Sequence, residues 1–106
     1  MKKAMISQPM NGIRENEIRD TRNRAIRKLE SLGYEVINTY FTGEWYRDEN
    51  IKKRGAEHIG LYFLSKSLEN MSKCDAVYFC KGWEAATGCK IEYEAAVAYG
   101  LKIIEE

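Results

Sequence analysis

Two hydrophobic patterns alternate along the chain: short apolar runs, and longer stretches in which apolar residues recur every three or four positions. The apolar runs predict strands at residues 3–7, 34–38, 76–80 and 101–104. The longer stretches predict helices from about residue 15 to 32, from about 61 to 73 and from 87 to 99. Their inward-facing stripes are expected to comprise Ile18, Ala25, Ile26, Leu29 and Leu32; Leu61, Leu64, Leu68 and Met71; and Ile91, Ala95 and Ala98. Residues 39–60 have no clear period and are predicted to form a loop followed by a short helix.

This order of strands and helices is typical of an α/β fold with a parallel sheet and helices on both faces. Right-handed crossovers favour a small Rossmann-like or flavodoxin-like sheet of four strands in the order 2-1-3-4. With 106 residues, the chain is expected to form one domain over residues 1–106. Ligands of such sheets bind outside the carboxyl ends of the strands, where the strand order reverses. The loops expected to carry function are therefore residues 7–12 and 81–88.

Composition narrows the possible functions. The 17 Lys and Arg residues nearly balance 16 Asp and Glu residues, so no basic face for duplex nucleic acid is expected. No apolar run approaches the ~18–20 residues of a membrane span. No long apolar stretch follows the basic start either, so a signal peptide is not expected and the protein is predicted to be cytoplasmic. Three cysteines without a CxxC pair and a single histidine argue against a disulfide framework and a zinc site. Neither a metal nor an organic cofactor is predicted.

The loop after the third predicted strand holds the most suggestive side chains. Gly82, Trp83, Glu84, Thr87 and Gly88 lie at or just before a helix start, where free amides and the helix dipole favour an anion such as phosphate. Trp83 either stacks on a nucleobase or covers the edge of the core. Gly88 either admits a ligand close to the backbone or simply permits a tight turn.

The first loop offers different groups. Ser7, Gln8, Pro9 and Met10 supply a hydroxyl, an amide and backbone groups that suit a ribose or a base, but neither GxGxxG nor GxxxxGK[ST] is present. Glu92 lies one turn into the last predicted helix, at the edge of its apolar stripe. It either reaches the mouth of the crevice or is simply solvated.

Three segments, residues 5–12, 32–38 and 75–100, together resemble the nucleoside 2-deoxyribosyltransferase-like superfamily, which includes nucleotide N-glycosidases. The chain looks most similar to a branch of short bacterial and phage-type proteins of unassigned function. In the enzymes of this superfamily, the glutamate four residues after the helix-start glycine is the nucleophile. The resemblance therefore implies that Glu92 attacks C1′ of a ribosyl or deoxyribosyl group and displaces the base. It also implies a homo-oligomer, dimeric or larger.

The sequence departs from the superfamily at two positions. Ala86 stands where the transferases usually carry aspartate and the hydrolases a phosphate-binding serine, and Gln8 replaces the first-loop glycine. Glu84 is a candidate substitute acid. The first hypothesis is an N-glycosidase or 2-deoxyribosyltransferase-like enzyme acting on a nucleoside or nucleotide. The second is a non-catalytic nucleotide-binding protein that senses or sequesters a nucleotide signal, and the third is a structural or interaction domain without a ligand.

Overall fold

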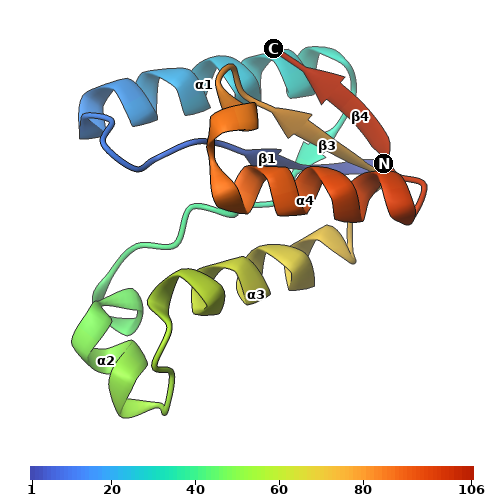
Figure 1. Ribbon diagram of the computed structural model, residues 1–106. Coiled ribbons are helices and arrows are strands. Elements are labelled where there is room, and N and C mark those ends of the chain that lie inside the picture. The colour runs from blue at the N-terminus through green and yellow to red at the C-terminus, as the bar shows by residue number, and fades with distance from the viewer.

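A computed structural model describes residues 1–106. The elements in chain order are β1 (Lys3–Ser7), α1 (Glu15–Ser31), β2 (Glu35–Val36), the 3₁₀ turn η1 (Glu44–Tyr46), α2 (Asp48–Lys53), α3 (Ile59–Met71), β3 (Ala76–Phe79), the 3₁₀ turn η2 (Trp83–Ala85), α4 (Thr87–Ala98) and β4 (Lys102–Glu105). The four strands are parallel and lie in the order β2-β1-β3-β4. Helix α1 covers one face of the sheet, and α3 and α4 lie on the other (Figure 1). The predicted fold class and strand order are therefore confirmed.

The central strands are buried because both of their faces are covered by helices. Strand β1 pairs with β3 from Ala4 opposite Ala76 to Ser7 opposite Phe79. Side chains of a strand alternate between its two faces, so successive residues of β1 enter different cores. Ala4 and Ile6 pack with Ala25 and Leu29 of α1, in the cluster that also holds Ala76, Tyr78 and Cys80. Met5 packs on the opposite face with Met71, Cys74, Val77, Phe79 and Ala96.

Helix α4 turns a different stripe inward from the one predicted. Its buried residues are Cys89, Glu92 and Ala96, whereas Ile91 is 39% exposed and Ala98 is exposed. The predicted stripe of Ile91, Ala95 and Ala98 is thus wrong at two of its three members. One residue corresponds to a rotation of ~100° about a helix axis, so an error of one or two positions moves a side chain to another face. The correction places Glu92 in the buried stripe rather than at its edge.

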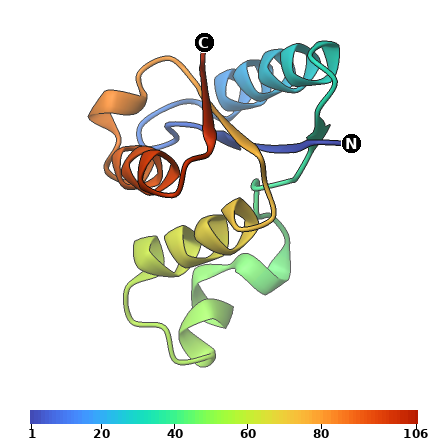
Figure 2. The same ribbon diagram turned by 90° about the vertical axis from the view of Figure 1, so that its right-hand side faces the viewer.

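The segment between β2 and β3 forms a lobe beside the sheet. Strand β2 contains only Glu35–Val36, shorter than the predicted strand 34–38, because it lies at the sheet edge and pairs with β1 over two residues. The following chain leads to η1 and α2, which lie at the end of α3 far from the sheet (Figure 2). Aromatic contacts among Phe41, Tyr46 and Phe63 hold this lobe together. Three further residues predicted to face inward are exposed. Leu32 lies beyond the end of α1 and is 51% exposed, and Leu61 and Leu68 of α3 are 61% and 36% exposed, because much of α3 lies in the lobe beyond the sheet.

The helices are also informative about membranes. None of them combines the length and the apolar character that crossing a bilayer requires.

Candidate functional site

A buried hydrogen bond joins the end of β1 to α4. The Ser7 hydroxyl donates to Glu92 Oε1 at 2.6 Å, and the two residues are only 1% and 7% exposed. Ser7 is the last residue of β1 and points to the α4 side of the sheet, while Glu92 lies on the inward stripe of α4 between Cys89 and Ala96. The pair lies near the carboxyl ends of β1 and β3, where the strand order reverses. This is the position at which open α/β sheets bind ligands.

Burial controls the electrostatics of this pair. Loss of solvent raises the pKa of Glu92 above its ordinary value, and hydrogen bonding from the Ser7 and Ser67 hydroxyls opposes that shift without cancelling it. Glu92 forms no ion pair with any Lys or Arg side chain. Hydroxyl groups, rather than an opposite charge, therefore stabilise its ionised form.

Cys89 lies one helical turn before Glu92 and shares its surroundings. Its thiol is buried, and desolvation raises its pKa despite a hydrogen bond with Ser7. Burial also raises the pKa of Cys80 to about 12 and that of Cys74 to about 11. All three cysteines are free. A protonated buried thiol is a poor nucleophile, so the raised pKa argues against Cys89 as a nucleophile.

The structure brings the two predicted loops together. Gly82 has a φ of 90°, a left-handed conformation that favours glycine, and a Cβ at this position would meet the Pro9 ring at 3.9 Å. The chain after β1 and the chain after β3 are thus neighbours. Pro9 and Met10 are partly buried, whereas Gly82 is exposed.

Trp83 has partners within the protein. Its ring stacks on Tyr93 with centroids 4.3 Å apart and planes at 13°, and it lies 5.4 Å from the Phe79 ring. Its indole N–H donates to Glu105 Oε1 at 3.1 Å. One ring face is therefore occupied, which favours the interpretation in which Trp83 covers the edge of the core over the one in which it stacks on a base.

The other candidates at the start of α4 are open to solvent. Glu84, Thr87 and Gly88 are exposed, and Ala86 precedes the helix without providing a side-chain cap. The first amides of α4 thus have no hydroxyl or carboxylate acceptor from the residue that precedes it. Because such amides attract anions, this end of α4 remains compatible with the predicted phosphate contact.

Gln8 faces away from Glu92. Its side-chain amide donates to the Ile18 carbonyl at 2.7 Å, and its oxygen accepts a hydrogen bond from Arg22 at 3.3 Å. Both partners belong to α1. Because consecutive strand residues point to opposite faces, Ser7 and Gln8 contribute to different sides of the sheet.

Sequence reasoning missed Arg22. This residue is 6% exposed and is buried on α1 together with Ile18, Ala25 and Leu29. The signal was present in the sequence, since Arg22 lies four residues after Ile18 and three before Ala25, on the apolar stripe itself. A cation on a buried stripe is unusual and indicates a specific polar environment.

A comparison with known families gives one match. The family described as "Domain of unknown function (DUF4406)" matches residues 2–105. The chain belongs to this family. No curated protein and no solved structure matches it. The DUF4406 match covers the whole sheet and all helices, so the family comprises the entire domain, and its description names no activity.

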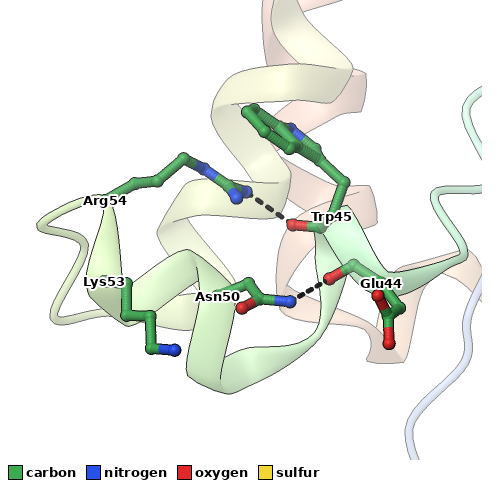
Figure 3. A pocket seen from close by; sticks show the side chains of 5 residues that line it. All are labelled: Glu44, Trp45, Asn50, Lys53 and Arg54. Carbon is green, nitrogen blue, oxygen red and sulfur yellow. Dashed lines mark hydrogen bonds between the residues drawn. The ribbon is translucent and has the colours of Figure 1, made fainter.

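Two surface hollows of this DUF4406 chain lie in or beside the lobe rather than at Glu92. One, of about 440 Å³, is lined by Glu44, Trp45, Asn50, Lys53 and Arg54, with the Arg54 guanidinium 3.9 Å above the Trp45 ring (Figure 3). The other, of about 370 Å³, lies between the chain after β2 and α3. It is lined by Asn38, Tyr40, Phe41, Thr42, Tyr46, Lys66, Glu69 and Asn70. Glu92 and Ser7 line neither of them.

Proposed function

We propose that this protein is a nucleoside or nucleotide N-glycosidase, or a 2-deoxyribosyltransferase-like enzyme, with Glu92 as its nucleophile. One observation carries the proposal: the Ser7 hydroxyl and the Glu92 carboxylate form a buried 2.6 Å hydrogen bond where the strand order reverses. The resemblance of residues 75–100 to the nucleoside 2-deoxyribosyltransferase-like superfamily supports the same assignment. A buried polar group at such a position is a reasonable candidate for function rather than for stability alone.

The proposed reaction follows from carboxylate chemistry. A Glu92 oxygen forms a bond to C1′ of the sugar while the N-glycosidic bond breaks, and the electron pair of that bond leaves with the base. The leaving base takes a proton from an acid. Water, or a second base, then bonds to C1′ and gives up a proton to the conjugate base of that acid, while the ester bond breaks and its electron pair restores the Glu92 carboxylate.

Ser7 suits this chemistry as a positioning residue. Its bond to Glu92 Oε1 fixes the plane of the carboxylate. Its hydroxyl also favours the ionised form that a nucleophile requires, against the burial that raises the pKa of Glu92. Glu84, exposed on η2, is the candidate acid for the leaving base.

A second function, nucleotide binding without turnover, is favoured by one specific observation. Ala86 occupies the position from which relatives in the superfamily supply an acid or a phosphate-binding hydroxyl, and its methyl group can do neither. In this alternative the protein senses or sequesters a nucleotide, and Glu92 accepts hydrogen bonds from the ligand.

The oligomeric state belongs to the same proposal. The lobe presents large apolar side chains to solvent, with Trp45 62% and Leu61 61% exposed. Covering such groups in a second copy of the chain would remove apolar surface from water. We therefore expect a homo-oligomer, dimeric or larger, which sedimentation of the purified protein would detect as a mass above that of the monomer.

Product analysis tests the catalytic proposal. The protein is incubated with a panel of nucleosides and nucleoside monophosphates, and free base is measured by chromatography. We expect release of free base by the wild type and a loss of at least about 10³-fold in Glu92→Gln, because the amide is a far weaker nucleophile. Glu94→Gln is the matched control, since Glu94 is exposed on the same helix.

The outcomes separate the two functions. Base release that survives in Glu92→Gln would exclude Glu92 as the nucleophile. No base release, together with thermal stabilisation of the wild type by one nucleotide of the panel, would support sequestration instead. Neither base release nor stabilisation would remove both proposals.

A further inference from the structure

The most unusual charge in the molecule lies on the other side of the sheet from Glu92. Arg22 is 6% exposed, yet it forms no ion pair with any carboxylate. A guanidinium keeps its charge at all physiological pH values, so it cannot escape burial by losing a proton. Desolvation lowers its pKa, which is a second sign that the surroundings disfavour the charge.

Neutral oxygens surround the guanidinium. It donates to Gln8 Oε1 at 3.3 Å, to Asn38 Oδ1 at 3.4 Å and to Thr39 Oγ1 at 3.2 Å. Charge-assisted hydrogen bonds are usually shorter, at ~2.7–2.9 Å. Arg22 thus has three long contacts to uncharged groups, and a guanidinium has five donors to satisfy.

The acceptors around Arg22 are themselves held in place. The Gln8 amide donates to the Ile18 carbonyl, the Thr39 hydroxyl donates to the Ile6 carbonyl at 2.9 Å, and Asn38 Oδ1 accepts the Tyr40 amide at 2.9 Å. Asn38 differs from the other two acceptors because it is exposed. It is therefore the acceptor that can move aside with the least disturbance.

Two residues that contact the Arg22 guanidinium also line a surface hollow. Asn38 and Tyr40, whose ring centroid is 5.4 Å from the Arg22 guanidinium carbon, both line the hollow of about 370 Å³ beside α3. Lys66 stands among the α3 residues of the same hollow. Its only ion pair is a long 3.9 Å contact with Glu69. The lining also includes the Glu69 carboxylate, and the Arg22 guanidinium lies behind Asn38 and Tyr40 rather than in the lining itself.

We propose that Arg22 forms the base of a binding site for a phosphate-type oxyanion, entered through the hollow between the chain after β2 and α3. The oxyanion replaces the Asn38 side chain at the guanidinium, and Lys66 attracts it from the α3 side. Guanidinium forks match phosphate oxygens in pairs, which neutral amide oxygens cannot reproduce. The proposal goes beyond the proposed function and does not require turnover at Glu92, since Arg22 and Glu92 contact opposite sides of β1.

Inorganic phosphate is the probe. Its binding to the wild type is measured by calorimetry and by the unfolding temperature, with sodium chloride of equal ionic strength as the reference. We expect phosphate to stabilise the wild type beyond chloride, and Arg22→Gln to weaken phosphate binding at least about tenfold. Arg27→Gln is the matched control, because Arg27 is exposed on the same helix. Lys66→Gln is expected to cause a smaller loss, and Asn38→Ala no loss.

The competing explanation is that Arg22 only connects α1 to the chain after β1 and the chain after β2 by hydrogen bonds. In that case the wild type binds phosphate no better than chloride, or Arg22→Gln binds it as well as the wild type, and either result overturns the proposal. Should Arg22→Gln fail to fold, Arg22→Lys decides: this variant keeps the charge without the fork, so an unchanged affinity for phosphate overturns the site and a lowered affinity supports it. Glu92→Gln must retain phosphate binding, which separates failure of this site from failure of the proposed catalysis.

Discussion

Two charged side chains are buried at the same end of β1, on opposite faces of the sheet. Glu92 meets Ser7 on the α4 side, and Arg22 meets Gln8 on the α1 side. Each is less than one-tenth exposed, and neither has a partner of opposite charge. Both depend on neutral polar groups from neighbouring elements, yet they respond to their burial in different ways.

The two side chains differ in whether they can lose their charge by gaining or releasing a proton. The Glu92 carboxyl can become neutral, and its raised pKa means that burial pushes it in that direction. The Arg22 guanidinium cannot become neutral at physiological pH, so its need for acceptor oxygens is permanent. The Glu92 region is therefore expected to respond to pH, whereas the Arg22 region is expected to respond to added anions.

Ser7→Ala is expected to have the largest effect on stability. It removes the 2.6 Å hydrogen bond to Glu92, and a buried hydrogen bond to a charged group accounts for about 2 kcal/mol. The loss is expected to be greatest where Glu92 is ionised, at pH values above its pKa. Urea unfolding of wild type and variant at several pH values measures it.

Ser65→Ala is the control for this variant, because the exposed Ser65 hydroxyl bonds only a carbonyl of its own helix. We expect it to change the free energy of unfolding by less than about 0.5 kcal/mol. Equal decreases in the free energy of unfolding of the two serine variants would show that the Ser7–Glu92 hydrogen bond stabilises the protein no more than an exposed one.

Glu92→Gln is expected to change how stability depends on pH. Because the folded state raises the pKa of Glu92, the folded protein binds this proton more tightly than the unfolded chain does. The contribution of Glu92 to stability is thus fully present below the ordinary glutamate pKa of 4.5 and is lost as pH rises from there through the folded pKa.

The glutamine variant lacks this titration, so the wild type should lose stability relative to it as pH rises through that window. The slope difference cannot exceed about 1.4 kcal/mol per pH unit for one proton. Parallel pH profiles of the two proteins, measured by chemical denaturation, would contradict the assignment. Glu94→Gln supplies the exposed comparison on the same helix.

Thr39→Val is expected to have the smallest effect, about 1 kcal/mol, on the Arg22 side. It removes one acceptor of the guanidinium and leaves the Ile6 carbonyl without the 2.9 Å bond from the Thr39 hydroxyl. Unlike the loss in Ser7→Ala, this loss should not vary between pH 5 and 8, since Arg22 stays charged throughout. Thr42→Val, at an exposed position of the same segment, is the control. A loss that follows pH like that of Ser7→Ala would remove the distinction between the two regions.

The fold could be predicted from the sequence because apolar residues recur with different periods in strands and in helices. The buried run of β3 and the order of elements led directly to the sheet that the structure has. Which side of α4 faces the sheet could not be predicted in the same way. Small residues at Gly88, Ala95, Ala96 and Ala98 make several stripes about equally apolar, so only contact with the sheet selects the one that contains Cys89, Glu92 and Ala96.

Trp83 illustrates a second limit. Its position in the loop after β3 was evident, but whether its ring meets a ligand or the core depends on Tyr93, ten residues later, and on Glu105 of β4. Neither contact follows from local sequence, because the first requires α4 to pack beside the loop after β3 and the second requires β4 to pair with β3.

The sequence by itself determined the strands, the helices and their parallel order, because these follow from hydrophobic periodicity and chain connectivity over short distances. Only the tertiary structure decided which polar side chains are buried and with which partners. Ser7 and Glu92 are 85 positions apart in the chain, and Arg22 reaches acceptors after two different strands. Hydrogen bonds of this kind are sensitive to differences of a few tenths of an ångström in the distance between elements. Those distances are fixed only when the helices pack on the sheet.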